Sequence, residues 1–109
     1  MIEISDAAAV SLELSAVAAE QVVSGLPMTG FAPLGEFAGQ EYGVWEMTPG
    51  SMRDVEADEL FVVLSGAGTV ALDGVVTVLT PGVVVRLAAG METVWVVTET
   101  LRKVYVSGV

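Results

Sequence analysis

Short apolar runs separated by turn residues dominate the chain from Tyr42 onward. Valine is the commonest residue in these runs, and branching at Cβ favours strands over helices. The Asp73-Gly74 pair is typical of a two-residue hairpin, because both central positions of that turn need positive φ angles. Spacings of roughly 8–12 residues between runs indicate one β-sandwich or barrel. The pattern predicts strands at 42–48, 60–65, 68–72, 75–80, 83–87, 93–98 and 102–107.

The first forty residues have no such regularity. Residues 10–14 alternate between apolar and polar and predict a strand, and residues 15–20 resemble a single helical turn. A continuous helix over residues 5–23 stays open as an alternative. Glycine and proline then interrupt residues 25–35, where we expect irregular backbone with an edge strand. We therefore expect residues 1–40 to form an arm packed on a barrel made by residues 41–109, in a single domain.

The charge and composition exclude several classes of function. Fourteen acidic residues against four basic ones give a net charge of −10, which argues against nucleic acids and anionic membranes as partners. The absence of cysteine and histidine removes thiol chemistry, the commonest metal ligand and the usual general base near neutral pH. The first ten residues lack the features of a signal peptide, and the apolar region 75–97 is interrupted by charges and Pro-Gly. We therefore expect a cytoplasmic protein.

Several short motifs follow one another in order along the predicted barrel. The motifs are Gly43-Val44-Trp45-Glu46, Pro49-Gly50, Asp58-Glu59, Leu64-Ser65-Gly66, Pro81-Gly82, Ala89-Gly90 with Trp95, and Arg102-Lys103-Val104-Tyr105-Val106. With them, residues 41–107 resemble the cupin superfamily, in particular its single-domain branch of ethanolamine-utilisation and ureidoglycine aminohydrolase-like cupins. The resemblance implies an all-β, jelly-roll β-barrel.

The same resemblance argues against the metal centre of many cupins. A metal-binding member takes two histidines and a glutamate from its first motif and one histidine from its second. Here the glutamate position is Glu59, the first two histidine positions fall within residues 52–55, and the last falls at Thr93, so all three histidines are missing. We therefore expect no metal and no cofactor.

The acidic stretch before the strand at 60–65 is not a calcium loop either. Its sixth position would need glycine for the sharp turn and holds Glu59, and its twelfth holds Ser65 in place of a bidentate glutamate. We interpret Asp54, Glu56 and Asp58 as loop acids exposed to water.

Glu59 and Glu46 are the candidate catalytic residues. On a strand, Glu59 shares a face with Phe61, and the resemblance places that face inside the barrel. A partly desolvated carboxylate there, which lies near Glu46 if the two strands are neighbours, would have a raised pKa and could serve as a general acid or base. In the alternative, Glu59 pairs with Arg53, Arg86 or Lys103, or simply caps the strand.

The candidate ligand-binding residues are aromatic or polar side chains expected around the barrel interior. Each tryptophan could stack on a ligand or pack in the core. Lys103 shares a face with Tyr105 and could hold an anionic ligand, or it could be an exposed charge on an edge strand. The set comprises Trp45, Phe61, Thr93, Trp95, Lys103, Tyr105 and Arg53.

Three hypotheses for function follow from these residues. The first, which we favour, is a metal-free barrel that binds a small organic molecule. The second is a metal-independent isomerase, lyase or hydrolase that uses an interior glutamate as acid or base. The third is a structural or interaction domain whose barrel is filled by its own side chains. By the resemblance, we also expect a homodimer joined through edge strands.

Overall fold

The computed structural model describes residues 1–108, which form nine strands and contain no helix. The expected all-β architecture is confirmed. The part of the chain that is described also contains no helix long and apolar enough to cross a membrane. The strands are β1 (Ser15–Ala16), β2 (Val22–Ser24), β3 (Met28–Phe37), β4 (Gln40–Met47), β5 (Gly50–Val55), β6 (Glu59–Leu72), β7 (Val75–Leu79), β8 (Val84–Leu87) and β9 (Glu92–Ser107).

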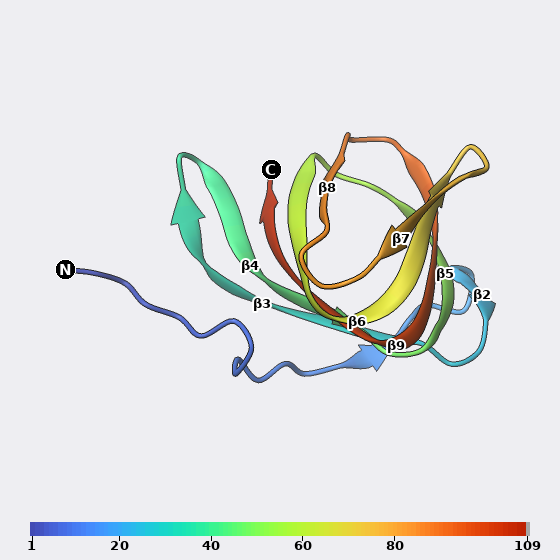
Figure 1. The fold of residues 1–109 in the computed structure, drawn as a ribbon, viewed down its shortest axis with the longest axis horizontal. Helices are drawn as coiled ribbons and strands as arrows, with labels where there is room; N and C mark the ends of the chain where they lie inside the picture. The colour runs from blue at the N-terminus through green and yellow to red at the C-terminus, as the bar shows by residue number, and fades with distance from the viewer. Residues whose placement is uncertain (109) are drawn as a thin grey trace.

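All nine strands belong to one antiparallel sheet that curls on itself (Figure 1). One path through the sheet runs β1-β3-β4-β9-β5-β2, and β6 pairs with β7, β8 and β9. Strands β6 and β9 are the longest, and they pair with each other from Glu59↔Ser107 to Ala71↔Val94. This long pair places residues from both ends of each strand around a common interior.

Strands β6 and β9 each merge two of the predicted strands. The expected break in β6 falls at Gly66, where φ is +93° and an added Cβ would overlap the backbone of Thr100 on β9. Glycine therefore lets the two backbones approach closely and bend, and the register shifts there while pairing continues. The glycine that predicted a turn between two strands is therefore part of a bulge within the single strand β6.

Strand β5 was not predicted, because its residues were interpreted as part of an acidic loop. It pairs with β9 in the register Met52↔Trp95 and Asp54↔Thr93. The strand begins at Gly50, and its side chains alternate between the interior and solvent, so that Met52 is buried while Arg53 is exposed. The acidic composition concealed this alternation.

The N-terminal arm contains neither the predicted helix nor the predicted strand at residues 10–14. Among residues 1–21, only Ser15–Ala16 belongs to a strand, and it pairs with β3. Farther along the expected arm, β2 and β3 are part of the sheet itself, paired with β5 and β4. The arm instead crosses the outer face of the sheet, where the Nη1 atom of Arg102 donates hydrogen bonds to the carbonyl oxygens of Ala7, Ala8 and Val10 at 2.9, 3.3 and 2.9 Å. Because these carbonyls bond a side chain on β9, they do not need the internal hydrogen bonds of a helix.

Candidate functional site

The inner face of the curled sheet carries an aromatic cage around a single charged side chain. The ammonium nitrogen of Lys103, on β9, lies 4.4 Å from the ring centre of Trp45, 4.3 Å from that of Phe61 and 4.7 Å from that of Trp95. The three rings also pack together, with Trp95 5.4 Å from Trp45 and 5.6 Å from Phe61. Strands β4, β6 and β9 thus each supply a wall of the cage, whose rings attract a cation through their negative faces.

Glu59 is the partner of Lys103. Its Oε2 atom accepts a hydrogen bond from Nζ at 2.6 Å. Lys103 is only 3% exposed, so it is not the edge charge considered as an alternative from the sequence. Burial lowers the pKa of the Lys103 ammonium, and the neighbouring Glu59 carboxylate opposes that change. Of the three cations considered for Glu59, the structure selects Lys103.

A second buried carboxylate, Glu56, lies at the far side of the cage. Its Oε2 atom accepts hydrogen bonds from Thr93 Oγ1 at 2.6 Å and from Trp95 Nε1 at 3.0 Å. The expectation that Glu56 is a loop acid in water is therefore wrong. Both donors lie on β9, more than thirty residues away, so no local pattern in the sequence indicates this burial. Thr93 and Trp95 hold Glu56 and fix the position of the indole ring.

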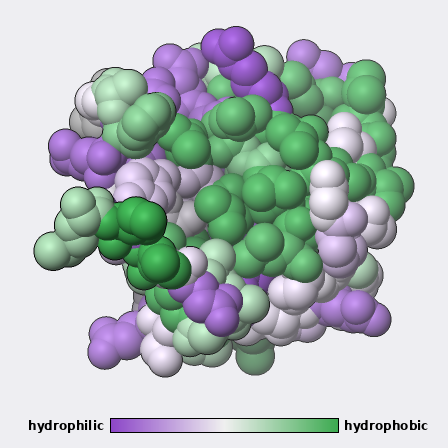
Figure 2. Space-filling model, turned by 60° about the vertical axis from the view of Figure 1, so that its left-hand side comes forward, coloured by the Kyte–Doolittle hydropathy of each residue, from purple (hydrophilic) through white to green (hydrophobic). Residues whose placement is uncertain are grey.

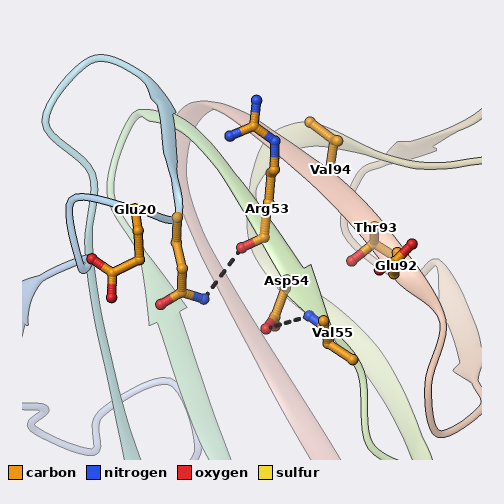
Figure 3. A pocket seen from close by; sticks show the side chains of 8 residues that line it. Glu20, Arg53, Asp54, Val55, Glu92, Thr93 and Val94 are labelled. Atoms are coloured by element: carbon orange, nitrogen blue, oxygen red, sulfur yellow. Dashed lines mark hydrogen bonds between the residues drawn. The ribbon is translucent and has the colours of Figure 1, made fainter.

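Asp54 lies beside this cluster, in a hollow of about 320 Å³ between β5 and the β1–β2 segment (Figure 3). Burial, reinforced by the charge of Glu56, raises the pKa of the Asp54 carboxyl to about 6. Figure 3 shows the Arg53 guanidinium directed away from Asp54. Arg53 is exposed, and its backbone carbonyl accepts a hydrogen bond from Gln21 Nε2 at 3.3 Å. The structure therefore does not place Arg53 near the cage.

A smaller hollow of about 200 Å³ is lined in part by Glu59, and we call it the Glu59 hollow. The hydroxyl of Tyr105 donates a hydrogen bond to Glu41 Oε2 at 2.9 Å within it. Burial and this carboxylate raise the pKa of the Tyr105 phenol, so the group stays protonated at neutral pH. The hollow thus combines aromatic walls with two carboxylates, and its lining residues are Phe31, Glu41, Trp45, Glu59, Tyr105 and Ser107.

Glu46 does not belong to this site. It follows Trp45 on β4, so its side chain points to the opposite face of the sheet. There its Oε1 atom accepts a hydrogen bond from Arg102 Nε at 3.2 Å. Strand β9 also separates β4 from β6, so the expected proximity of Glu46 to Glu59 is corrected by the structure.

The residues at the cupin metal-ligand positions do not fit a metal centre. Among residues 1–108, no group of three or more histidine, cysteine, aspartate or glutamate side chains could hold a metal ion. None of residues 52–55, where two imidazoles would be required, is a histidine, and Thr93, at the third position, has its hydroxyl already bonded to Glu56. The carboxylate of Glu59 is paired with an ammonium, whose positive charge would repel a metal cation.

The centre of the curled sheet is filled by side chains. Met47, Phe61 and Trp95 are all essentially inaccessible to solvent. This filling is what the hypothesis of a structural domain requires. The Glu59 hollow lies at the edge of the filled region. It supplies the open space for a small molecule that the other two hypotheses require.

Comparison with known proteins identifies the family of this architecture. The sequence profile of the EutQ-like cupin domain matches residues 34–105. No match was found among curated proteins. The cupin fold is confirmed by solved structures that resemble this chain.

Three of these solved structures illustrate the resemblance. The EutQ protein of Clostridium difficile is 19% identical with a TM-score of 0.67, over 75% of this chain and 68% of that one. A protein of unknown function from Rhizobium leguminosarum is 23% identical with a TM-score of 0.68, over 73% of this chain and 80% of that one. Another protein of unknown function, from Pseudomonas syringae, is 25% identical with a TM-score of 0.77, over 90% of this chain but only 44% of that one.

Proposed function

This chain belongs to the EutQ-like cupin domain family, and we propose that it binds a small organic molecule in the Glu59 hollow without the help of a metal. The observation that supports this proposal most strongly is the hollow itself, where aromatic rings and two carboxylates face solvent at the edge of a filled interior. Apolar walls with a few placed polar groups are typical of sites for small molecules.

The size and chemistry of the hollow limit the ligand. A volume of about 200 Å³ lies below the range of roughly 300–1,000 Å³ that is usual for sites of drug-sized ligands, so the hollow suits a smaller molecule. Trp45 and Phe31, which are partners on the paired strands β4 and β3, offer ring surfaces for stacking. Glu41 and Glu59 can accept hydrogen bonds from hydroxyl or amino groups of the ligand. A small polar molecule with a short carbon chain fits these features.

Two phenylalanines on β3 provide a matched test of this site. Phe31 lines the hollow and is 60% exposed, whereas Phe37 is 75% exposed near the end of the strand and does not line it. We expect small hydroxylated aldehydes, ketones, amines and acids, screened by NMR, to include compounds that shift the indole signal of Trp45. For such a compound, Phe31→Ala should weaken binding about 3- to 10-fold, since it removes a stacking surface.

In the same measurement, Phe37→Ala should leave the affinity unchanged. Equal effects of the two substitutions, or a screen in which no compound shifts the Trp45 signal, would contradict the proposed site.

Elemental analysis of the purified protein tests the metal-free part of the proposal. We expect metal contents far below one ion per chain, because the side chains at the ligand positions do not suit a transition metal. Stoichiometric iron, manganese, nickel or zinc would refute it.

The expected homodimer stays a prediction, and one surface favours it. Figure 2 shows a broad hydrophobic area on one face of the molecule. On adjacent strands of the outer face, Val84 of β8 lies opposite Val62 of β6, which lies opposite Val104 of β9. Exposed apolar areas of this kind often mark interfaces. Light scattering should therefore give the mass of a dimer, and the mass of a monomer would refute the prediction.

A further inference from the structure

Lys103 is an unusual residue for its position. It is the sole lysine of the chain, in a protein with a net charge of −10, and it is 3% exposed. Lysine is rarely buried, because removing an ammonium from water costs several kcal/mol before any pairing. An apolar side chain of similar volume would often serve stability as well or better. Stability alone therefore gives no reason for the chain to place its one lysine inside.

We propose that Lys103 is a nucleophilic amine that forms an imine with a small aldehyde or ketone bound in the Glu59 hollow. The proposal rests on the proposed function, because it assigns a substrate class to the same site. Lysines that react in this way lie in apolar surroundings beside a group that can move a proton. Lys103 has both, since three aromatic rings surround its nitrogen and Glu59 lies 2.6 Å away.

The hollow and the amine share two walls. Glu59 and Trp45 both line the hollow, and both contact the Lys103 ammonium. The amine is therefore one side chain away from a bound ligand. The Glu59 side chain is 16% exposed and so reaches solvent. The proposal requires that Glu59 turn toward solvent once it has taken the proton, so that the ligand can reach Nζ.

Burial favours the free amine of Lys103 as a reactant, against the effect of the charges around it. Burial lowers the pKa of the ammonium, while Glu59, Glu56 and Asp54 all act to raise it. Among these, only Glu59 is bonded to the nitrogen. Glu56 accepts hydrogen bonds from Thr93 and Trp95. Glu59 is thus the group placed to take the proton when the amine attacks.

The reaction balances with these groups alone. Glu59 takes a proton from the Lys103 ammonium, and the free amine attacks the carbonyl carbon to form a carbon–nitrogen bond. Nitrogen loses a second proton as the carbonyl oxygen gains one, which gives a neutral carbinolamine. Glu59 then returns its proton to the hydroxyl, which leaves as water while the carbon–nitrogen double bond forms. The product is a protonated imine, so the positive charge of the ammonium is restored at the nitrogen. The rings of Trp45, Phe61 and Trp95 stabilise that charge as they stabilise the ammonium.

The variant Arg86→Lys provides an internal control for this reaction. Arg86 is exposed on β8, so the substitution adds an ordinary surface amine to a molecule that retains Lys103. The protein is incubated at pH 7 with glycolaldehyde and sodium cyanoborohydride, which reduces an imine to a stable secondary amine. Peptide mapping by mass spectrometry then gives the rate of labelling at each lysine. The N-terminal amine appears in a separate peptide.

We expect labelling at Lys103 to be at least about tenfold faster than at the introduced lysine, because a surface amine is almost fully protonated at pH 7. In the Glu59→Gln background, labelling of Lys103 should fall by about 100-fold, as expected for the loss of a general acid–base group. In that background the surface lysine should keep its rate, which shows that the reagents remain active. Labelling only at the surface lysine in the folded protein would overturn the proposal, and so would equal rates at Lys103 with and without Glu59.

A second readout separates this proposal from the proposed function. Glycolaldehyde without the reductant should shift the indole NMR signal of Trp45 if the molecule enters the hollow. A shift without any label at Lys103 would refute the imine and leave the binding site intact. Absence of both the shift and the label, with no other compound of the screen binding, would refute both.

Discussion

Arg102 and Lys103 are neighbours on β9, yet their side chains enter opposite faces of the sheet and form two different ion pairs. Arg102 lies 3.2 Å from Glu46 on the outer face, with the two side chains 13% and 18% exposed. Lys103 lies 2.6 Å from Glu59 on the inner face, with exposures of 4% and 16%. The two pairs have the same charges and similar burial of the acid, so the difference between them comes from what else surrounds each cation.

The outer pair has the features of a structural clamp. The Arg102 guanidinium contacts Glu46 and three backbone carbonyls of the arm, so that one side chain joins β4, β9 and the N-terminal segment. The inner cation instead bonds one carboxylate and faces three rings. Guanidinium suits several fixed hydrogen bonds, whereas a buried ammonium readily changes its protonation state. The comparison teaches that β9 supports the arm with one residue and provides a reactive group with the next.

The largest effect should come from removing the outer clamp. Arg102→Ala leaves Glu46 without its cation and the arm carbonyls without their donor. We expect the free energy of unfolding to fall by about 3 kcal/mol, measured by urea denaturation, and limited proteolysis to cut the arm before Ser15. Arg86→Ala, at an exposed site, should change the stability by no more than about 0.5 kcal/mol. Equal stability of the two variants would contradict the assignment of Arg102 as a clamp.

A smaller effect should distinguish the two acids. Glu59→Gln leaves a deeply buried ammonium beside a neutral group and should cost about 2 kcal/mol at pH 7, because the ammonium must then lose its proton. Glu46→Gln keeps a hydrogen-bond acceptor for Arg102 at a wetter site and should cost about 1 kcal/mol or less.

The pH dependence separates these two variants further. In Glu59→Gln, the folded-state pKa of Lys103 lies further below its unfolded value, so the unfolded chain binds the extra proton and the lost stability returns as the pH rises toward 10.5. Denaturation curves at pH 7 and pH 9.5 measure this recovery. A cost that does not depend on pH would contradict the account of Lys103 as a titrating group.

An effect of the opposite sign concerns Asp54, another carboxylate on the inner side. Its pKa is about 6 in the folded protein and 3.8 for an aspartate side chain in water, so the folded state holds a proton that the unfolded state has lost between these values. Stability should therefore fall as the pH rises from about 4 to 6. Asp54→Asn removes this loss and should be more stable than the native chain by about 1–2 kcal/mol at pH 8, after allowance for screening by solvent.

For Asp54→Asn, the gain should vanish near pH 4, where the native carboxyl is protonated. Urea denaturation at both pH values tests this, and an equal difference at pH 4 and pH 8 would show that Asp54 does not titrate as described.

Local patterns predicted the strands well where turn residues bound apolar runs, as at β7 and β8. They failed where polar residues point inward. Met52, Asp54 and Glu56 alternate toward the interior, but their acidic neighbours made the segment resemble a solvated loop. Burial of Glu56 depends on donors from β9, and no short window of sequence contains both.

The candidate site was predictable in part. The shared face of Lys103 and Tyr105 followed from alternation, and Lys103 was among the partners considered for Glu59. Alternation also separates Glu46 from Trp45, since neighbouring residues of a strand face opposite sides. The cage could not be predicted, because it requires the order of strands β4, β9 and β6 in the sheet.

The most direct test of the account is the pKa of Lys103 itself. Because the chain contains one lysine, protein grown with ¹³C-labelled lysine gives a single Cε signal, which moves when the ammonium loses its proton. The account predicts that this signal titrates well below 10.5 in the folded protein, and at about 10.5 when the protein is unfolded in urea. A folded-state midpoint at or above 10.5 would show that the cage and Glu59 hold a permanently charged ammonium, and it would contradict the assignment of Lys103 as a reactive amine.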